Sequence, residues 1–347
     1  MNRLAIPEDQ RAPKLVVADR TLVLIVVVLA SFLTPFDVSA VNLALPAIGA
    51  EFAMDAVTLA WVATSYLLTL AIFLVPFGRI ADIHGRKRIF IYGTVLFAIA
   101  SFLISLSFSS ATVIAFRALE GFAASMITGT GVAILTSVYP AGEKGKALGI
   151  SVAAVYLGLS AGPFLGGLMT QYIGWRSIFY INIPLGIGIA VISLTKMKGE
   201  WAEAKGERFD RVGSIIYGLT LFTLVYGLTL LPALIGIGLI VVGAGGTAIF
   251  VFWEMRTRFP VLHVSLLARN RAFALSNVAA LINYSATFAV TLLLSLYLQS
   301  VRGFSPEIAG TILVSQPIVQ AIVSPVAGRL SDRIEPRIVA TVPDATP

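Results

Sequence analysis

The sequence predicts an all-α membrane protein with ten spanning helices. The first observation is composition: of 347 residues, 57% are hydrophobic and 12% are charged, against about 25% charged in a typical soluble domain. The second is a set of long apolar runs, and the third is the alternation of basic residues between the loops that join them. A chain with a mean hydropathy of +0.90 needs lipid around its helices, because no soluble core could bury so much apolar surface.

Each predicted span is a run of about 20 or more mostly apolar residues, long enough to cross a bilayer. The runs are residues 21–48, 58–78, 89–108, 111–139, 147–171, 177–195, 212–231, 233–253, 272–299 and 306–327. The first 20 residues carry charges and lead directly into the first run, so we expect no cleaved signal peptide.

Basic residues are distributed asymmetrically between the loops. With the N-terminus inside, 22 of the 25 lysines and arginines fall in cytoplasmic segments. Arg176 and Arg302 fall in outer loops, and Arg117 lies inside a span. This pattern predicts a multi-pass protein of the inner (plasma) membrane with a cytoplasmic N-terminus. The formal net charge of +7 is therefore a topology signal and predicts no nucleic-acid partner.

A short motif occurs twice at cytoplasmic helix ends. Residues 78–88 read GRIADIHGRKR and residues 328–334 read GRLSDRI, so the two copies are 250 residues apart. A parallel repeat of six spans, with two extra helices inserted between the copies, would produce this offset and keep both copies in one orientation.

The second copy of the repeat is incomplete, because the last residues are too few and too rich in proline to form four more spans. We therefore expect a fragment or a truncated reading frame that holds ten of about fourteen helices. The predicted organisation is a cytoplasmic N-terminal segment (1–20), an N-terminal six-helix bundle (21–195), a cytoplasmic linker (196–211), two inserted spanning helices (212–253), and an incomplete C-terminal bundle (254–347) with two helices and a degenerate loop motif.

Several segments together resemble the major facilitator superfamily, and in particular its fourteen-helix drug:proton antiporters. The first-span segment 37–46 (DVSAVNLALP) resembles a signature of that branch, and 78–87 fits the loop motif GxxxDxxGRK. RALEG at 117–121 resembles the fourth-helix motif RxxQG, and GLSAGPFLGG at 158–167 resembles the antiporter motif of the fifth helix. WRSIFYINIP at 175–184 and Phe209-Asp210 are also similar to this branch. The resemblance covers residues 21–337 and implies the major facilitator fold.

Two positions depart from the family pattern. Glu120 stands where the fourth-helix motif usually has glutamine, which places a second acid in the membrane. In the second loop copy, Glu335 and Pro336 replace the usual Gly-Arg pair, so the gating role of that copy is in doubt.

Three ionisable residues lie at depth inside the predicted spans: Asp37, Arg117 and Glu120. Such groups cost roughly 2.5–3.5 kcal/mol to insert, so they usually face an interior cavity and have a function. At about 1.5 Å per residue, Asp37 and Glu120 lie roughly 17 and 14 Å below the outer ends of their helices. Arg117 and Glu120 are three residues apart and can pair.

Our hypothesis is that Asp37 and Glu120 bind substrate and protons competitively, while Arg117 keeps one carboxylate ionised. The alternative is structural: Arg117 and Glu120 form a neutralised pair and Asp37 hydrogen-bonds a neighbouring helix. The resemblance adds Asn42, in the first-span signature, to the substrate- and proton-binding residues.

The remaining motif residues have a mechanical interpretation. Gly78 and Gly85 would allow tight turns, and Asp82 and Arg86 would pair across the short connection. The resemblance implies a gate there that latches one conformation. In the fifth span, the small residues of the motif would permit close packing, and its proline would introduce a kink. The motif consists of Gly158, Gly162, Pro163, Gly166 and Gly167. Helix packing alone could explain this set; the resemblance implies that it favours export over import.

The predicted function is secondary active transport: proton-coupled export of amphipathic drugs or related toxic compounds. The expected partners are a hydrophobic or cationic small molecule, protons and the lipid bilayer. We expect no cofactor, because the proton gradient supplies the energy and there is no Walker loop for ATP. There are no cysteines, and His84 and His263, both in predicted loops, form no metal or catalytic cluster.

Three other interpretations are weighed against it. The protein could export another small metabolite on the same fold, or it could be a truncated, non-transporting remnant. A membrane-embedded enzyme is disfavoured, because the spans hold no Ser/His pair, no histidine cluster and no Asp-rich loop. We therefore expect that the protein is not an enzyme.

Overall fold

Helices form every regular element in residues 19–303 and 306–331, the part of the chain that the computed structural model describes. The first six long helices are α1 (Arg20–Glu51), α2 (Ala56–His84), α3 (Arg86–Ser105), α4 (Ser110–Val138), α5 (Lys144–Tyr172) and α6 (Arg176–Lys196), with a short 3-10 turn, η2 (Ala141–Glu143), before α5. They are followed by α7 (Arg211–Thr229), α8 (Leu234–Glu254), α9 (Val264–Arg269), α10 (Arg271–Leu296), the π-helical turn η3 (Tyr297–Val301), α11 (Pro306–Leu313) and α12 (Ser315–Ser331).

Local sequence signals set the helix starts. The side chain of Asp19 accepts hydrogen bonds from the first backbone amides of α1, and Asp55 accepts one from Thr58 N at 2.8 Å at the start of α2. Ser109 and Thr112 form a reciprocal capping box at the start of α4. These caps satisfy backbone donors that the first turn of a helix leaves free.

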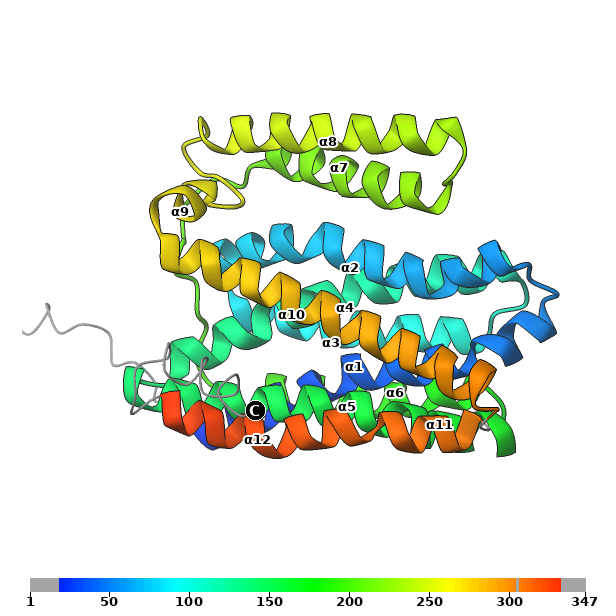
Figure 1. The fold of residues 1–347 in the computed structure, drawn as a ribbon. Coiled ribbons are helices and arrows are strands. Elements are labelled where there is room, and N and C mark those ends of the chain that lie inside the picture. Colours follow the sequence, from blue (N-terminus) through cyan, green and yellow to red (C-terminus); the bar gives the residue numbers. More distant parts are fainter. Residues whose placement is uncertain (1–18, 304–305, 332–347) are drawn as a thin grey trace, which may run out of the picture.

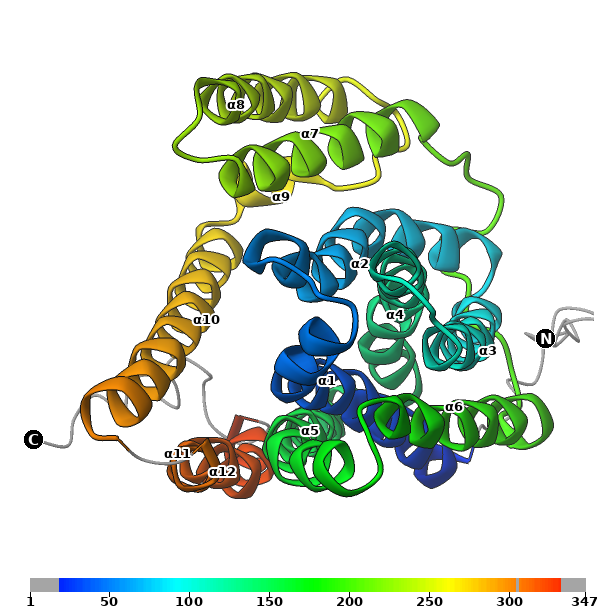
Figure 2. The same ribbon diagram turned by 90° about the vertical axis from the view of Figure 1, so that its right-hand side faces the viewer.

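Helices α1 to α6 form one bundle, seen end-on in Figure 2. Within it α1 lies against α5, and α4 lies between α2 and α3. Glycines permit close approach: a Cβ on Gly121 of α4 would lie 2.1 Å from the carbonyl oxygen of Tyr66 in α2. Small residues have this role in membrane bundles, where packing rather than water exclusion holds helices together.

The pair α7 and α8 lies beyond α2, outside the six-helix bundle (Figures 1 and 2). Its contacts with the bundle are made through α7: the Tyr217 hydroxyl donates to the Ala71 carbonyl at 3.2 Å, and the rings of Trp61 and Tyr226 are 5.8 Å apart. On another side of the bundle, α12 packs along α5.

Eight helices, α1 to α8, meet the length and hydropathy expected of membrane spans within the described part of the chain. The predicted span 272–299 corresponds to α10 and most of η3. The prediction of one continuous span at 306–327 was wrong, because the structure divides it into α11 and α12. The physical reason is Pro317: it lacks an amide hydrogen, and in a continuous helix its ring would clash with the carbonyl of Leu313, the last residue of α11.

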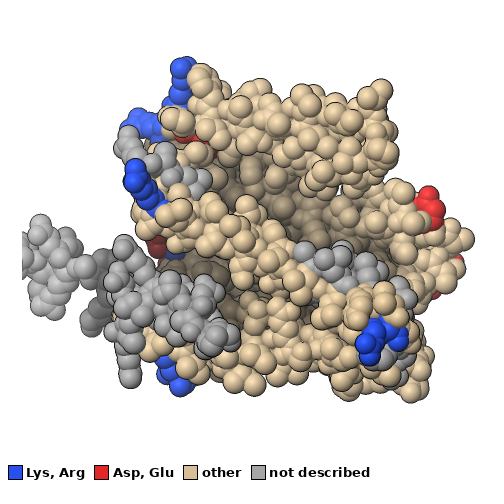
Figure 3. Space-filling model, in the orientation of Figure 1, with Lys and Arg blue, Asp and Glu red and all other residues tan. Residues whose placement is uncertain are grey.

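Charged side chains gather at the ends of the helices. Figure 3 shows most lysines and arginines of the visible face at one end of the molecule and an uncharged band beyond them. Large apolar side chains are exposed along the spanning helices, among them Ile99, Leu194 and Ile249. This is the surface of a multi-pass membrane protein, since apolar side chains that face lipid need no protein cover.

Candidate functional site

Three ionisable side chains meet inside the first bundle. Asp37 comes from α1, while Arg117 and Glu120 lie one turn apart on α4. Asp37 and Glu120 are 0% exposed and Arg117 is 1% exposed. The sequence predicted a shared depth and an Arg117–Glu120 pair, and the structure brings all three side chains into contact.

Arg117 is the centre of this cluster. Its Nη1 donates to Asp37 Oδ2 and to Glu120 Oε2, each at 2.6 Å. Its Nε donates to the Val62 carbonyl at 3.3 Å, and the guanidinium carbon lies 4.3 Å from the centre of the Tyr66 ring. Contacts from α1, α2 and α4 therefore fix the guanidinium in place.

The cluster has more negative than positive charge. Two carboxylates share one guanidinium, so the group carries a net charge of −1 when both acids are ionised. An uncompensated charge in a buried site is costly, and a proton or a cationic group in contact with either carboxylate would remove it. The arrangement can therefore take up one positive charge.

Two further residues, which the sequence analysis did not assign to the site, complete the cluster. Asn182 Nδ2 in α6 donates to Asp37 Oδ1 at 2.8 Å, and Ser101 Oγ in α3 donates to Glu120 Oε1 at 2.7 Å. Their only sequence signal is a polar side chain within an apolar span, and Asn182 stood out only as part of the sixth-span signature. These spans are apolar on nearly all faces, so spacing alone does not show which side faces the interior.

Asn42 does not join the cluster. It is exposed in the structure and lies five residues after Asp37 on α1, which turns it about 140° away around the helix axis. Its assignment to the binding residues stays a prediction, separate from the buried charges.

The loop motif between α2 and α3 contains a single non-helical residue. Gly85 ends α2 and precedes α3 with φ of 118°, a conformation that favours glycine. Arg86 then pairs with Asp82 at 2.7 Å, as the sequence predicted. The expected turn at Gly78 was wrong, because that residue lies inside α2, where a Cβ would be 4.0 Å from the carbonyl of Gly129 in α4. His84 is likewise the last residue of α2 rather than a loop residue.

Arg86 also binds the linker between α6 and α7. It is 6% exposed, and its Nη1 donates to Glu203 Oε1 at 2.7 Å and to the carbonyl of Ala133 at 3.3 Å. The hydrogen bond from Arg86 lowers the pKa of the Glu203 carboxyl below its ordinary value. The loop motif is therefore bonded to a segment more than 100 residues away in sequence.

The same linker contacts the loop at further points. Ala204 N donates to the carbonyl of Asp82 at 2.9 Å, and Glu200 accepts from Lys87 N at 2.8 Å. Arg79 pairs with Glu207. The acids of the linker, Glu200, Glu203 and Glu207, are thus spaced so that each contacts a basic residue of the loop motif. The sequence alone did not show that these charges pair.

The glycines of α5 face α1. A Cβ on Gly158 would lie 2.5 Å from the carbonyl oxygen of Phe32, and one on Gly162 would lie 2.5 Å from Ser39 Cβ. Cβ atoms on Gly166 and Gly167 would lie 2.7 Å from Ala40 Cβ and 2.8 Å from Leu43 Cδ2. The close helix approach predicted for this motif is present.

Pro163 lies inside α5 and leaves the carbonyl of Leu159 without its helical partner. Ser39 Oγ of α1 donates to that carbonyl at 3.0 Å. In the membrane a freed backbone group must find another partner, and here the neighbouring helix provides it.

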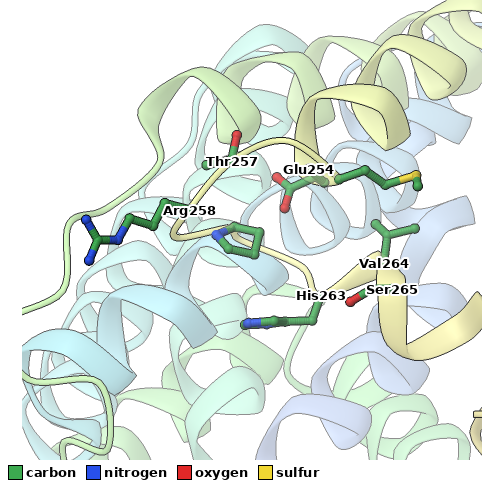
Figure 4. Close-up of a pocket in the computed structure, with 8 residues that line it drawn as sticks. Glu254, Thr257, Arg258, His263, Val264 and Ser265 are labelled. Carbon is green, nitrogen blue, oxygen red and sulfur yellow. The ribbon is translucent and has the colours of Figure 1, made fainter. Parts of the chain in front are cut away.

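A cavity of about 320 Å³ lies elsewhere, between the end of α8 and the start of α9 (Figure 4). Its lining includes Glu254, Arg258, His263 and Ser265, and none of the predicted site residues. Within the described residues, no three His, Cys, Asp or Glu side chains gather as a metal site would require. The buried cluster on α1 and α4 therefore remains the candidate site.

Comparison with known proteins gives matches that bear on the family and the fold of the chain. A family model described as "Major Facilitator Superfamily" matches residues 27–343. The chain is 34% identical over 316 residues to the riboflavin transporter RibZ of Clostridioides difficile, covering 90% of the chain and 68% of that protein. It is 33% identical over 323 residues to the multidrug resistance protein Stp of Mycobacterium tuberculosis, covering 91% of the chain and 60% of that protein. The chain thus spans between three fifths and about two thirds of the length of these relatives.

A solved structure with a similar fold is the proton:xylose symporter XylE bound to 6-bromo-6-deoxy-D-glucose. The TM-score is 0.58 at 13% identity, and the match covers 91% of this chain and 70% of that one. At this identity the similarity concerns the fold alone.

Proposed function

The chain belongs to the major facilitator superfamily, and on that premise we propose that it serves the export of amphipathic, often cationic compounds in exchange for protons. Among its relatives, Stp is named for multidrug resistance, which supports a drug as the exported compound. The proposal makes the protein a secondary transporter of the cell membrane, with its N-terminus in the cytoplasm, and not an enzyme.

The buried cluster of Asp37, Arg117 and Glu120 is the observation on which the proposal rests. Arg117 bonds both carboxylates, which leaves one negative charge without compensation. A proton and a cationic substrate both remove this charge, so occupation by one opposes binding of the other. Such competition is what exchange of a drug for a proton requires.

The other motifs have supporting roles in this proposal. The bonded loop and linker around Arg86 act as a latch for one conformation at the cytoplasmic side. The α1–α5 contact, with its glycines and Pro163, is the packed seam along which the bundle changes between its inward and outward states, and we propose that it favours export.

A second candidate substrate is a planar metabolite such as riboflavin. The similarity to RibZ favours it, since that relative is named a riboflavin transporter. The fold and the charge cluster would serve either substrate, and a direct comparison of the two separates them.

The test is transport by proteoliposomes that contain the chain, with an imposed pH gradient and either ethidium or riboflavin as the substrate. Asp37→Asn removes one of the two charges, and we expect it to abolish proton-driven transport while the protein still inserts. The matched control is Asp55→Asn, an exposed helix cap at which asparagine caps as well as aspartate.

Transport of ethidium by the unmodified chain and by Asp55→Asn, but not by Asp37→Asn, supports drug export. Transport of riboflavin alone supports the second candidate. Proton-driven transport that survives Asp37→Asn contradicts the assigned role of the cluster, and no transport of any compound by an inserted chain supports a non-transporting remnant.

A further inference from the structure

We propose that Asn182 is a positioning residue that serves Asp37 in both of its protonation states. In the ionised state the Asn182 amide donates to the carboxylate; in the neutral state it rotates and accepts from the carboxyl group. This inference rests on the proposed function, in which Asp37 takes up and releases a proton.

The geometry begins with the two oxygens of Asp37. Oδ2 accepts from Arg117 Nη1 at 2.6 Å, and Oδ1 accepts from Asn182 Nδ2 at 2.8 Å. Both partners are donors, which suits a carboxylate, since that group only accepts. The structure therefore shows Asp37 with the surroundings of its ionised form.

The second observation is the other end of the Asn182 side chain. Asn182 is 0% exposed, and its Oδ1 is buried without a hydrogen-bond partner among the described residues. A buried acceptor left without a partner is unfavourable, because it has lost its hydrogen bonds to water and gained none in the protein. The unpaired Asn182 Oδ1 is thus unfavourable while Asp37 is ionised. It gains a hydrogen-bond partner if it accepts from Asp37 once that residue is protonated.

Protonation of Asp37 creates that use. A proton on Oδ2 would disrupt the charge-assisted bond to Arg117, so the proton adds to Oδ1. The new O–H would then face Nδ2 of Asn182, donor against donor. A half-turn of the amide brings its oxygen to this position, so that the O–H donates to Asn182 Oδ1.

Of the two side chains that hydrogen-bond Asp37 among the described residues, only Asn182 can both donate and accept. Arg117 only donates, and Glu120 accepts from the same Arg117 nitrogen as Asp37. From α2, Tyr66 presents its ring to Arg117. Among the described residues, no hydrogen bond to Asp37 comes from α5.

The experiment is infrared difference spectroscopy between alkaline and acid pH, on the purified chain in lipid. The carbonyl band of the protonated Asp37 is identified by its loss in Asp37→Asn. In Asn182→Leu the carboxyl O–H has lost its acceptor, so we expect the band at higher wavenumber than in the unmodified chain. In Asn182→Ser, whose hydroxyl can both donate and accept, we expect an intermediate position.

The control is Asn277→Leu, which removes an exposed amide that donates to the Phe273 carbonyl of its own helix, α10. We expect this control to leave the Asp37 band unmoved. If the Asn182–Asp37 hydrogen bond served only to hold α1 and α6 together, the band would also stay unmoved in the Asn182 variants.

The outcomes separate the two proposals. An Asp37 band at one unchanged wavenumber in the unmodified chain, Asn182→Leu and Asn182→Ser overturns the role of Asn182 and leaves proton uptake at Asp37 intact. Should Asp37 give no such band at any pH, proton uptake at this residue is refuted, and both proposals fall together.

Discussion

At the scale of single residues, the chemistry of the site depends on Arg117. It is buried among two carboxylates, a backbone carbonyl and an aromatic ring. Removing one partner of a buried ion pair is far more harmful than removing the whole set, because the remaining charges stay buried without compensation. Arg117 should therefore contribute to stability as well as to the proposed binding.

Arg117→Leu should reduce the free energy of unfolding by about 3–5 kcal/mol, since it leaves Asp37 and Glu120 as neighbouring buried acids. The measurement is unfolding of the purified protein followed by tryptophan fluorescence. In the triple variant Arg117→Leu with Asp37→Asn and Glu120→Gln, no charge remains to be compensated, and we expect most of the lost stability to return. A triple variant as unstable as Arg117→Leu would show that packing, and not charge, explains the loss.

At the scale of helices, the contact between α1 and α5 shows how composition determines packing distance. The glycines of α5 bring it against the backbone of α1, and the proline of α5 frees a carbonyl that Ser39 then bonds. Close approach and cross-helix hydrogen bonding thus come from one short motif.

Gly158→Ala should lower the free energy of unfolding by about 1–3 kcal/mol, because its Cβ would overlap the Phe32 carbonyl oxygen at 2.5 Å. Thermal unfolding measured in the same detergent would test this. The matched control is Gly188→Ala in α6, where a Cβ meets nothing within 4 Å, and we expect no loss there. Equal effects of the two substitutions would argue against a close seam at Gly158.

At the scale of the whole molecule, the described helices lie roughly parallel, with most basic groups at one end (Figures 1 and 3). The linker between α6 and α7 joins the inserted pair to the loop motif at this end, through Glu203 and Arg86. The basic end is the predicted cytoplasmic side, so the arrangement in the membrane is open to a direct test.

The absence of cysteine makes that test simple. Single cysteines can be placed at two exposed positions: Phe108, at the predicted outer end of the span 89–108, and Gly142, in a loop predicted to be inside. A membrane-impermeant maleimide applied to intact cells should label Phe108→Cys at once, and Gly142→Cys only after permeabilisation. Labelling in the reverse order would show that the N-terminus is outside.

Much of the fold was open to prediction because its signals are local. Apolar runs predicted the ends of α1 to α8 within three residues, except that α2 continues six residues beyond its predicted end. The pairing of Asp82 with Arg86 followed from their spacing across a short connection. The break between α11 and α12 was also signalled locally, by Pro317, although the hydropathy of 306–327 concealed it.

What the sequence by itself determined is that this is a multi-pass α-helical membrane protein with three ionisable groups at depth, since the cost of burying charge and polar backbone in lipid depends on composition and length. Only the tertiary structure decided that Asp37 and Glu120 share Arg117. It also decided that Asn182 donates to Asp37 Oδ1, that Ser101 donates to Glu120 Oε1, and that Asn42 lies outside the cluster. Those contacts join α1, α3, α4 and α6, and the rotation of one apolar helix against another is set by side-chain packing, which no single helix encodes.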